Sequence, residues 1–266
     1  MDRISTKFES LRSSGRKALI PFITAGDPSL EATVPVMHAL VQAGADIIEL
    51  GVPFSDPMAD GPTIQRSSEQ ALRRGAGLRY VLQAVAEFRQ QDADTPVVLM
   101  GYLNPIEIHG YARFAEEAIQ AGVDGVLLVD LPPEEADETR AIFTRHGLAL
   151  IALASPTTSP ERMGMLCDTA QGYLYYVSFA GVTGAGHLDP HAAGERLHTL
   201  RARSRVPVVA GFGIKDAASA AAMALEADGV VVGSALVAIL AEATDPADAA
   251  SRAAAFLAPL REALDA

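Results

Sequence analysis

Short apolar runs rich in β-branched residues alternate along this chain with longer amphipathic segments. Runs of this length and composition are typical of strands that are buried on both faces, as in a parallel sheet. We expect eight such strands, at residues 18–24, 46–52, 96–102, 125–130, 148–155, 173–179, 207–213 and 229–235. The segments between them begin with helix-capping signals. The returns to the next strand are marked by Gly44, Gly122, Gly147 and Gly172.

Eight strands, each followed by at least one helix, most simply close into a (β/α)8 barrel, the TIM-barrel fold, with residues 1–266 as a single domain. An open, doubly wound sheet is the alternative. Residues 4–12 predict an extra N-terminal helix that covers the barrel bottom, and residues 71–91 predict an extra helix after the second strand. Residues 234–240 predict another extra helix after the eighth strand, ahead of a longer one from about Pro246.

Composition and charge narrow the class of protein. The chain is 49% hydrophobic with a formal net charge of -12, and no basic run offers nucleic-acid phosphates a binding surface. Cys167 is the single cysteine, which argues against a disulfide framework or a Cys-based metal site. No stretch approaches the roughly 20 apolar residues of a membrane helix, and the N-terminus lacks a signal-peptide core. We therefore expect a soluble, cytoplasmic protein.

Two carboxylates lie close together in the sequence but in different surroundings. Glu49 is inside an apolar, strand-like run, and Asp60 belongs to the Pro-rich loop just after it. Burial raises the pKa of a carboxyl group toward neutrality, where the group can both donate and accept protons. Such a pair is typical of a site that separates acid and base roles. The structural alternative is a core Glu49 satisfied by backbone or arginine, and an Asp60 that caps the helix beginning near Thr63.

Glycines cluster where the last strands are expected to end. Residues 211–213 are Gly-Phe-Gly and residues 233–234 are Gly-Ser, and both lead directly into helical segments. Barrels often bind phosphate here, because glycine lets backbone N–H groups and a helix N-terminus approach an anion closely. A third cluster, residues 181–186, is interpreted as a lid whose Thr183 can reach a neighbouring acid. A flexible surface loop is the alternative.

The remaining candidates describe the substrate and the type of chemistry. Apolar or aromatic side chains at the expected strand ends are candidates to line a pocket for a flat hydrophobic substrate: Phe22, Met100, Leu127, Tyr175 and Phe212. Histidines are few and scattered, so we expect no metal site. No lysine lies inside a strand run, which argues against a Schiff-base aldolase. Carbon–carbon cleavage here would therefore need acid–base chemistry.

Six blocks of sequence match one family in order: Pro21-Phe-Ile-Thr-Ala-Gly-Asp-Pro28, Glu49-Leu-Gly-Val-Pro-Phe-Ser-Asp-Pro-Met-Ala-Asp-Gly-Pro62, Met100-Gly-Tyr-Leu-Asn-Pro105, Asp130-Leu-Pro-Pro133, Gly181-Val-Thr-Gly184 and Gly211-Phe-Gly-Ile214. Over essentially its whole length the chain resembles the α subunit of tryptophan synthase. The resemblance implies cleavage of indole-3-glycerol phosphate into indole and glyceraldehyde 3-phosphate. It also implies an α2β2 assembly with a β partner that joins indole to serine using pyridoxal phosphate, so no cofactor is expected in this chain.

The resemblance also implies a role for each candidate residue. Glu49 would protonate indole C3 and take the proton of the glycerol C3′ hydroxyl in a retro-aldol step. Asp60 would stabilise positive charge at the indole nitrogen and accept its proton, held in place by Thr183. Phosphate would be bound by Gly184, Gly213, Gly233 and Ser234. The indole would be enclosed by Phe22, Leu127, Tyr175 and Phe212. Positions near the β partner and its indole tunnel would include Asp56, Pro57, Asn104 and Pro132.

Some features leave other functions open. Phe179 stands where some family members carry an arginine, which puts the details of lid closure in doubt. Met100 and Val129 change the size of the side chains in the pocket wall more than their polarity. Another phosphate-binding barrel, such as a phosphoribosyl isomerase, would share the glycine clusters but would not need the block from Glu49 to Asp60. Two further alternatives are a catalytically silent subunit that only activates a β partner, and a free-standing lyase that releases indole.

Overall fold

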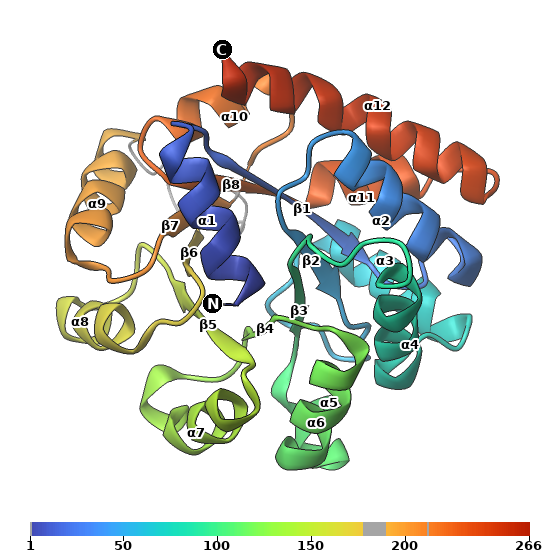
Figure 1. Cartoon of the computed structure of the whole chain (residues 1–266), viewed down its shortest axis with the longest axis horizontal. Coiled ribbons are helices and arrows are strands. Elements are labelled where there is room, and N and C mark those ends of the chain that lie inside the picture. Colours follow the sequence, from blue (N-terminus) through green and yellow to red (C-terminus); the bar gives the residue numbers. More distant parts are fainter. Residues whose placement is uncertain (1, 178–189, 212) are drawn as a thin grey trace.

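The computed structural model describes residues 2–177, 190–211 and 213–266, with only the backbone described for residues 190–196. Within these residues eight parallel strands pair in chain order, and the eighth pairs with the first to close a barrel (Figure 1). The strands are β1 (Ala18–Thr24), β2 (Ile48–Gly51), β3 (Val97–Gly101), β4 (Gly125–Leu128), β5 (Ala149–Ala154), β6 (Leu174–Val177), β7 (Val208–Gly211) and β8 (Gly229–Val232). The predicted (β/α)8 barrel is confirmed, and the open sheet is excluded.

Helices surround the barrel and confirm the predicted additions. They are α1 (Arg3–Ser13), α2 (Thr33–Gln42), α3 (Pro62–Arg73), α4 (Leu78–Phe88), α5 (Leu103–His109), α6 (Tyr111–Ala121), α7 (Asp137–His146), α8 (Pro160–Thr169), α9 (Pro190–Arg203), α10 (Ala217–Ala224), α11 (Ser234–Leu240) and α12 (Pro246–Asp265), with short 3₁₀ turns η1 (Leu30–Ala32) and η2 (Pro133–Glu135). The pair after β3 was not predicted; Gly110, with φ of 91°, separates α5 from α6. No helix within the described ranges is long and apolar enough to cross a membrane.

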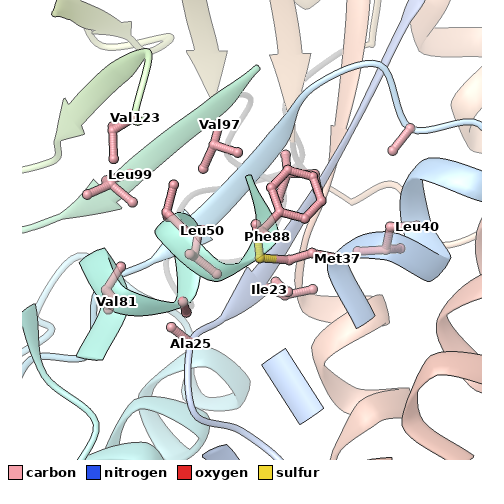
Figure 2. Close-up of a cluster of buried hydrophobic side chains, with 14 of the residues drawn as sticks. Ile23, Ala25, Met37, Leu40, Leu50, Val81, Phe88, Val97, Leu99 and Val123 are labelled. Carbon is pink, nitrogen blue, oxygen red and sulfur yellow. The ribbon is translucent and has the colours of Figure 1, made fainter. Parts of the chain in front are cut away.

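Alternate residues of each strand point into the barrel or outward to the helices. Figure 2 shows part of the outward set, which packs against α2 and α4: Ile23, Leu50 and Leu99 from the strands, with Met37, Leu40, Val81 and Phe88 from the helices. The inward set forms a separate cluster that includes Ile20, Val98, Leu127, Tyr173, Tyr175 and Val209. Since Leu50 points outward, its neighbour Glu49 points into the barrel.

Three aspartates connect neighbouring strands at their N-terminal ends, which form the lower end of the barrel. Asp46, Asp124 and Asp228 each lie just before a strand and accept a backbone N–H from the start of another strand, at 2.8–2.9 Å; the donors are Leu19, Val97 and Val208. Each aspartate also pairs with an arginine, respectively Arg261, Arg89 and Arg201. The repeated Ala-Gly-x-Asp sequence before the second and fourth strands therefore has a structural role.

Helix α1 closes the lower end of the barrel (Figure 1). Its N-terminus is capped by Asp2, and its buried residues Ile4, Phe8 and Leu11 pack with the inward side chains of the strands. The rings of Phe8 and Tyr173 lie 6.0 Å apart between centroids. The predicted N-terminal helix over the barrel bottom is confirmed. The upper end of the barrel, formed by the C-terminal ends of the strands, is where active sites of this fold lie.

Candidate active site

Glu49 is a fully buried carboxyl group inside the barrel. Its Oε1 accepts a hydrogen bond of 2.5 Å from the Tyr173 hydroxyl, and its Oε2 has no hydrogen-bond partner among the described residues. Burial raises the pKa of Glu49 from 4.5 to about 7, although the Tyr173 hydroxyl opposes this by stabilising the carboxylate. No backbone group or arginine satisfies this side chain in the described part of the chain. The geometry therefore favours a proton-transfer group over a structural core residue.

Asp60 lies in the loop between β2 and α3, and it is held by a tyrosine. Its Oδ2 accepts a hydrogen bond of 3.0 Å from the Tyr102 hydroxyl, which in turn accepts one of 3.0 Å from the Ala59 N–H. Burial raises the pKa of Asp60, and the bond from Tyr102 lowers it in part. The alternative that Asp60 caps the next helix is wrong: Gly61 is the N-cap residue of α3, and no side chain caps it.

Tyr175 connects the surroundings of the two acids. It is nearly buried on β6, and its pKa is raised well above the usual value first by burial and then by the charges of Glu49 and Asp60. Asp60 also lines a hollow with Phe22 and Gly51, and Phe22 on β1 pairs with Glu49 on β2. The structure thus brings together two acids that the sequence placed on a strand and on a loop.

Glycines leave room for aromatic rings above Glu49. Gly51 and Gly211 are the last residues of β2 and β7, and Gly233 follows β8. A side chain at Gly51 would run into the ring of Phe22, and one at Gly211 would run into Tyr175. At Gly233 an added Cβ would lie 3.5 Å from the Cβ of Phe22, within ordinary contact. Phe22 on β1 and Tyr175 on β6, two of the predicted indole-pocket residues, therefore extend over the barrel end because the neighbouring strands β2 and β7 end in glycine.

The predicted phosphate site is described in part. Gly213 has a left-handed backbone with φ of 71°, and Gly233 is the N-cap residue of α11, whose first residue is Ser234. No side chain in the described part of the chain caps α11, and uncapped N–H groups at a helix start favour an anion. The rest of the predicted site lies outside the described residues, namely Thr183, Gly184, Phe212, Phe179 and the predicted lid at residues 181–186.

The hollow beside Asp60 is small. It holds about 20 Å³ and is lined by side chains that include Phe22, Met100, Tyr102 and Val129. Leu127 is buried on the inward face of β4. An indole ring needs more space than this, so a substrate would have to move the surrounding side chains, among which Phe22 lies against Gly51.

The residues predicted near a partner lie on loops and a helix that follow strands. Asp56 and Asn104 are exposed, and Pro57 and Pro132 are half-buried. Pro132 also lines a hollow of about 340 Å³ between the β4 and β5 loops. Two large apolar side chains beside these positions are exposed to solvent, Met58 at 82% and Ile108 at 79%. Met58 follows Pro57 directly, and Ile108 lies one helical turn after Asn104 on α5, so both are near positions predicted to contact a partner.

Sequence reasoning missed two tyrosines, Tyr102 and Tyr173, which bind the two acids. Both occur in segments that were singled out, one in the block from Met100 and the other two residues before Tyr175. The period of two along a strand places Tyr173 and Tyr175 on the same face, which was a usable signal. Among the described residues, no group of three or more His, Cys, Asp or Glu is placed to hold a metal ion.

Comparison with known proteins identifies the family. The family model described as Tryptophan synthase alpha chain matches residues 8–265. The chain belongs to the tryptophan synthase alpha chain family. The alpha chain of Xanthomonas oryzae pv. oryzae strain MAFF 311018 is 80% identical over 100% of this chain and 99% of its own length. That of Xanthomonas campestris pv. campestris strain B100 is 79% identical, over 100% and 98% respectively.

Solved structures of the same family have the same fold. The tryptophan synthase subunit alpha of Legionella pneumophila str. Paris superposes with a TM-score of 0.92 at 48% identity, covering 100% of this chain and 99% of that one. A chain of Mycobacterium tuberculosis tryptophan synthase in an aminoacrylate-bound form gives 0.87 at 37% identity, covering 99% and 100%. Membership of the tryptophan synthase alpha chain family makes this TIM barrel a lyase of tryptophan biosynthesis.

Proposed function

We propose that this chain cleaves indole-3-glycerol phosphate into indole and glyceraldehyde 3-phosphate by a retro-aldol reaction. The observation that carries the proposal is Glu49, a fully buried carboxyl group whose Oε2 has no hydrogen-bond partner among the described residues and whose pKa is raised to about 7. An acid–base group works best when its pKa lies near the working pH. Family membership supports the choice of this reaction, and the carboxyl group of Glu49 has the properties that such a reaction needs.

Glu49 acts as a proton shuttle in this proposal. In its protonated form it gives a proton to C3 of the indole, and the positive charge that results is shared with the ring nitrogen. The carboxylate then takes the proton of the C3′ hydroxyl, the C3–C3′ bond breaks, and its electrons restore the aromatic indole while the C3′ carbon becomes an aldehyde. Glu49 ends protonated, as it began. A pKa near neutrality lets one group perform both transfers.

Asp60 stabilises the positive charge at the indole nitrogen. The Tyr102 hydroxyl holds Oδ2 of Asp60, which leaves Oδ1 to accept the N–H of the ring. A fixed carboxylate in a site that excludes water stabilises developing positive charge by a few kcal/mol, because little solvent screens it. Asp60 takes the nitrogen proton as charge develops and returns it when the ring regains aromaticity.

Substrate binding needs a phosphate anchor and an apolar pocket. Gly213, Gly233 and Ser234 are proposed to bind the phosphate through backbone N–H groups and the uncapped start of α11, together with Gly184. The ring would lie among the buried or nearly buried side chains of Phe22, Leu127 and Tyr175, together with Phe212. In this arrangement the phosphate is held by β7 and β8, and the reacting carbon faces Glu49 on β2.

We also propose that a tryptophan synthase β chain binds the face that carries Asp56, Pro57, Asn104 and Pro132, in an α2β2 assembly. The β chain would use pyridoxal phosphate to join the released indole to serine. The exposed side chains of Met58 and Ile108 support this location, because large apolar groups contribute much of the energy of protein interfaces when they are buried. The solved Mycobacterium tuberculosis tryptophan synthase is described in an aminoacrylate-bound form.

The direct test is a cleavage assay with indole-3-glycerol phosphate, with and without a family β chain. We expect release of glyceraldehyde 3-phosphate in both cases and a large increase in rate on mixing. Cleavage that depended on an added metal, or a lysine adduct trapped by borohydride, would refute the mechanism. Cleavage unaffected by β would support a free-standing lyase instead. No cleavage in either case would support a silent subunit.

Interface variants test the partner proposal separately. Met58→Asp and Ile108→Asp each place a charge in the proposed contact and should abolish most of the β-dependent increase, while the rate of the isolated chain stays close to the parent's. Leu225→Asp is the matched control, since Leu225 is also exposed, at 76%, but lies after α10, at the lower end of the barrel. Equal effects of all three substitutions would contradict the proposed location.

A further inference from the structure

A small basic hollow lies at the lower end of the barrel, opposite the proposed active site. It holds about 190 Å³ between the end of α1, the start of β1 and the segments that precede β7 and β8. Its charged lining residues are Arg12, Arg16, Lys17, Arg201 and Asp228. Four cations and one carboxylate converge here in a chain whose net charge is -12. Such a local reversal of sign attracts small anions.

The cations of this basic hollow are only partly neutralised. Arg12 forms no hydrogen bond or ion pair with any described residue, although most other arginines near it are paired. Arg16 uses its Nε and Nη2 to bind Asp265, at 2.9 Å each, which leaves the donors of Nη1. Arg201 uses Nη2 to bind Asp228 at 2.9 Å. Each guanidinium carries five N–H donors, so most of them remain available.

The one carboxylate of the hollow is already occupied. Asp228 accepts Arg201 at Oδ1 and the N–H of Val208 at Oδ2. Lys17 is held by the carbonyl oxygen of Ala227, 2.7 Å from its Nζ. Its pKa is lowered by burial first and then by the charge of Arg201, so the two cations repel each other, although the carboxylates of Asp228 and Glu226 partly offset this repulsion. An anion between them would relieve that repulsion.

Helix-end electrostatics explain the single cations but not their convergence. Arg12 lies in the last turn of α1 and Arg201 in the last turn of α9, where a positive charge interacts favourably with the helix dipole. Each arginine makes this interaction with its own helix. It does not require both helix ends to meet Arg16 and Lys17 around a cavity, with Gly15 leaving the entrance open.

We propose that this basic hollow is a binding site for a small anion of the phosphate class. Guanidinium groups bind phosphate oxygens in paired, directional hydrogen bonds, and a lysine ammonium adds a point charge. The volume suits inorganic phosphate, pyrophosphate or the head of a phosphomonoester. The site is separate from the phosphate position proposed after β7 and β8, because it lies at the N-terminal ends of the strands.

The test must distinguish the two phosphate positions, and side-chain NMR of arginine does so. The Nε–Hε signals of Arg12 and Arg201 are observed in the full-length protein during titration with inorganic phosphate, pyrophosphate and glycerol phosphate in separate experiments. We expect both signals to shift and saturate together. The signal of Arg12 is assigned by its disappearance in Arg12→Gln. The relative affinities of the three anions identify the preferred member of the class.

Matched variants complete the test. Arg12→Gln should weaken the binding measured at Arg201 by about tenfold or more, because it removes an unpartnered cation from the lining. Arg205→Gln is the control, since Arg205 is exposed near the same end of the barrel but does not line the hollow. Signals that do not move with any of the anions would overturn the proposal. So would equal affinities in the parent and Arg12→Gln. Cleavage activity is measured separately, so the two proposals fail independently.

Discussion

Replacing Glu49 by glutamine should stabilise the fold, and the gain should grow with pH. Burial raises the pKa of Glu49 from 4.5 to about 7. A carboxyl group whose pKa is raised by folding stabilises the folded state fully below its unfolded pKa, and this contribution is lost as the pH rises through the folded pKa. At about 1.4 kcal/mol per pKa unit, the shift from 4.5 to about 7 corresponds to roughly 3 kcal/mol.

The glutamine variant isolates this effect because it keeps the shape of the side chain. Its Oε1 can still accept the hydrogen bond from Tyr173, and its amide group replaces Oε2, which has no partner among the described residues. Any cost of burying that amide is the same at every pH. The change in stability difference between two pH values therefore reports the titration of Glu49 alone.

The assay is urea unfolding of the parent and Glu49→Gln at about pH 5 and pH 8, where the advantage of glutamine should grow by about 2–3 kcal/mol between the two values. Glu9→Gln removes one negative charge from an exposed position on α1 and serves as the control for net charge. A stability difference that stays constant with pH, or that moves in the opposite direction, would refute the reasoning about burial.

Three further substitutions test the surroundings of the acids. Tyr173→Phe removes the hydroxyl that stabilises the carboxylate of Glu49, so the apparent pKa in the pH profile of kcat/KM should rise by about one unit, and a fall would contradict this. Tyr102→Phe removes the hydrogen bond to Asp60, which lowers the pKa of that carboxyl group, so its pKa should rise and kcat should fall most at low pH. Steady-state kinetics that match the parent at every pH would show that the bond between Tyr102 and Asp60 has no role in the reaction. Gly211→Ala drives a Cβ into Tyr175 and should destabilise the fold by about 1–3 kcal/mol in urea unfolding, with partial recovery when Tyr175→Phe is added.

The barrel itself could be predicted because its signals are local. The eight apolar runs and the glycines between them mark strands and turns within a few residues, and β1 has the predicted bounds. Within the described residues, β2, β3, β4, β5 and β8 are shorter than predicted at one or both ends, although backbone hydrogen bonds such as that from Val52 N–H to the Met100 carbonyl continue past the end of β2. The helix pair after β3 was not predicted, because a single residue, Gly110 with its positive φ, separates α5 from α6.

Of the candidate site, the two acids were the part that the local sequence made easiest to predict. Glu49 stands out because a carboxyl group inside an apolar strand is costly, and this cost is visible in the sequence alone. Its partner Tyr173 lies 124 residues away, and only closure of the barrel brings them together. The helix-cap interpretation of Asp60 was wrong because α3 begins one residue later than expected from Asp60, with Gly61 as its N-cap residue, and Tyr102 binds the Asp60 carboxylate instead. The basic hollow likewise depends on contacts between distant segments, which no local pattern reveals.

Proton transfer by Glu49 is the step on which the proposed retro-aldol reaction depends. It is tested most directly by measuring the cleavage of indole-3-glycerol phosphate by the parent chain and by Glu49→Gln near pH 7, each confirmed to be folded. Glutamine can neither donate the proton to C3 nor take one from the hydroxyl, so the variant should lose cleavage by several orders of magnitude. Activity of the variant within about tenfold of the parent would contradict the account.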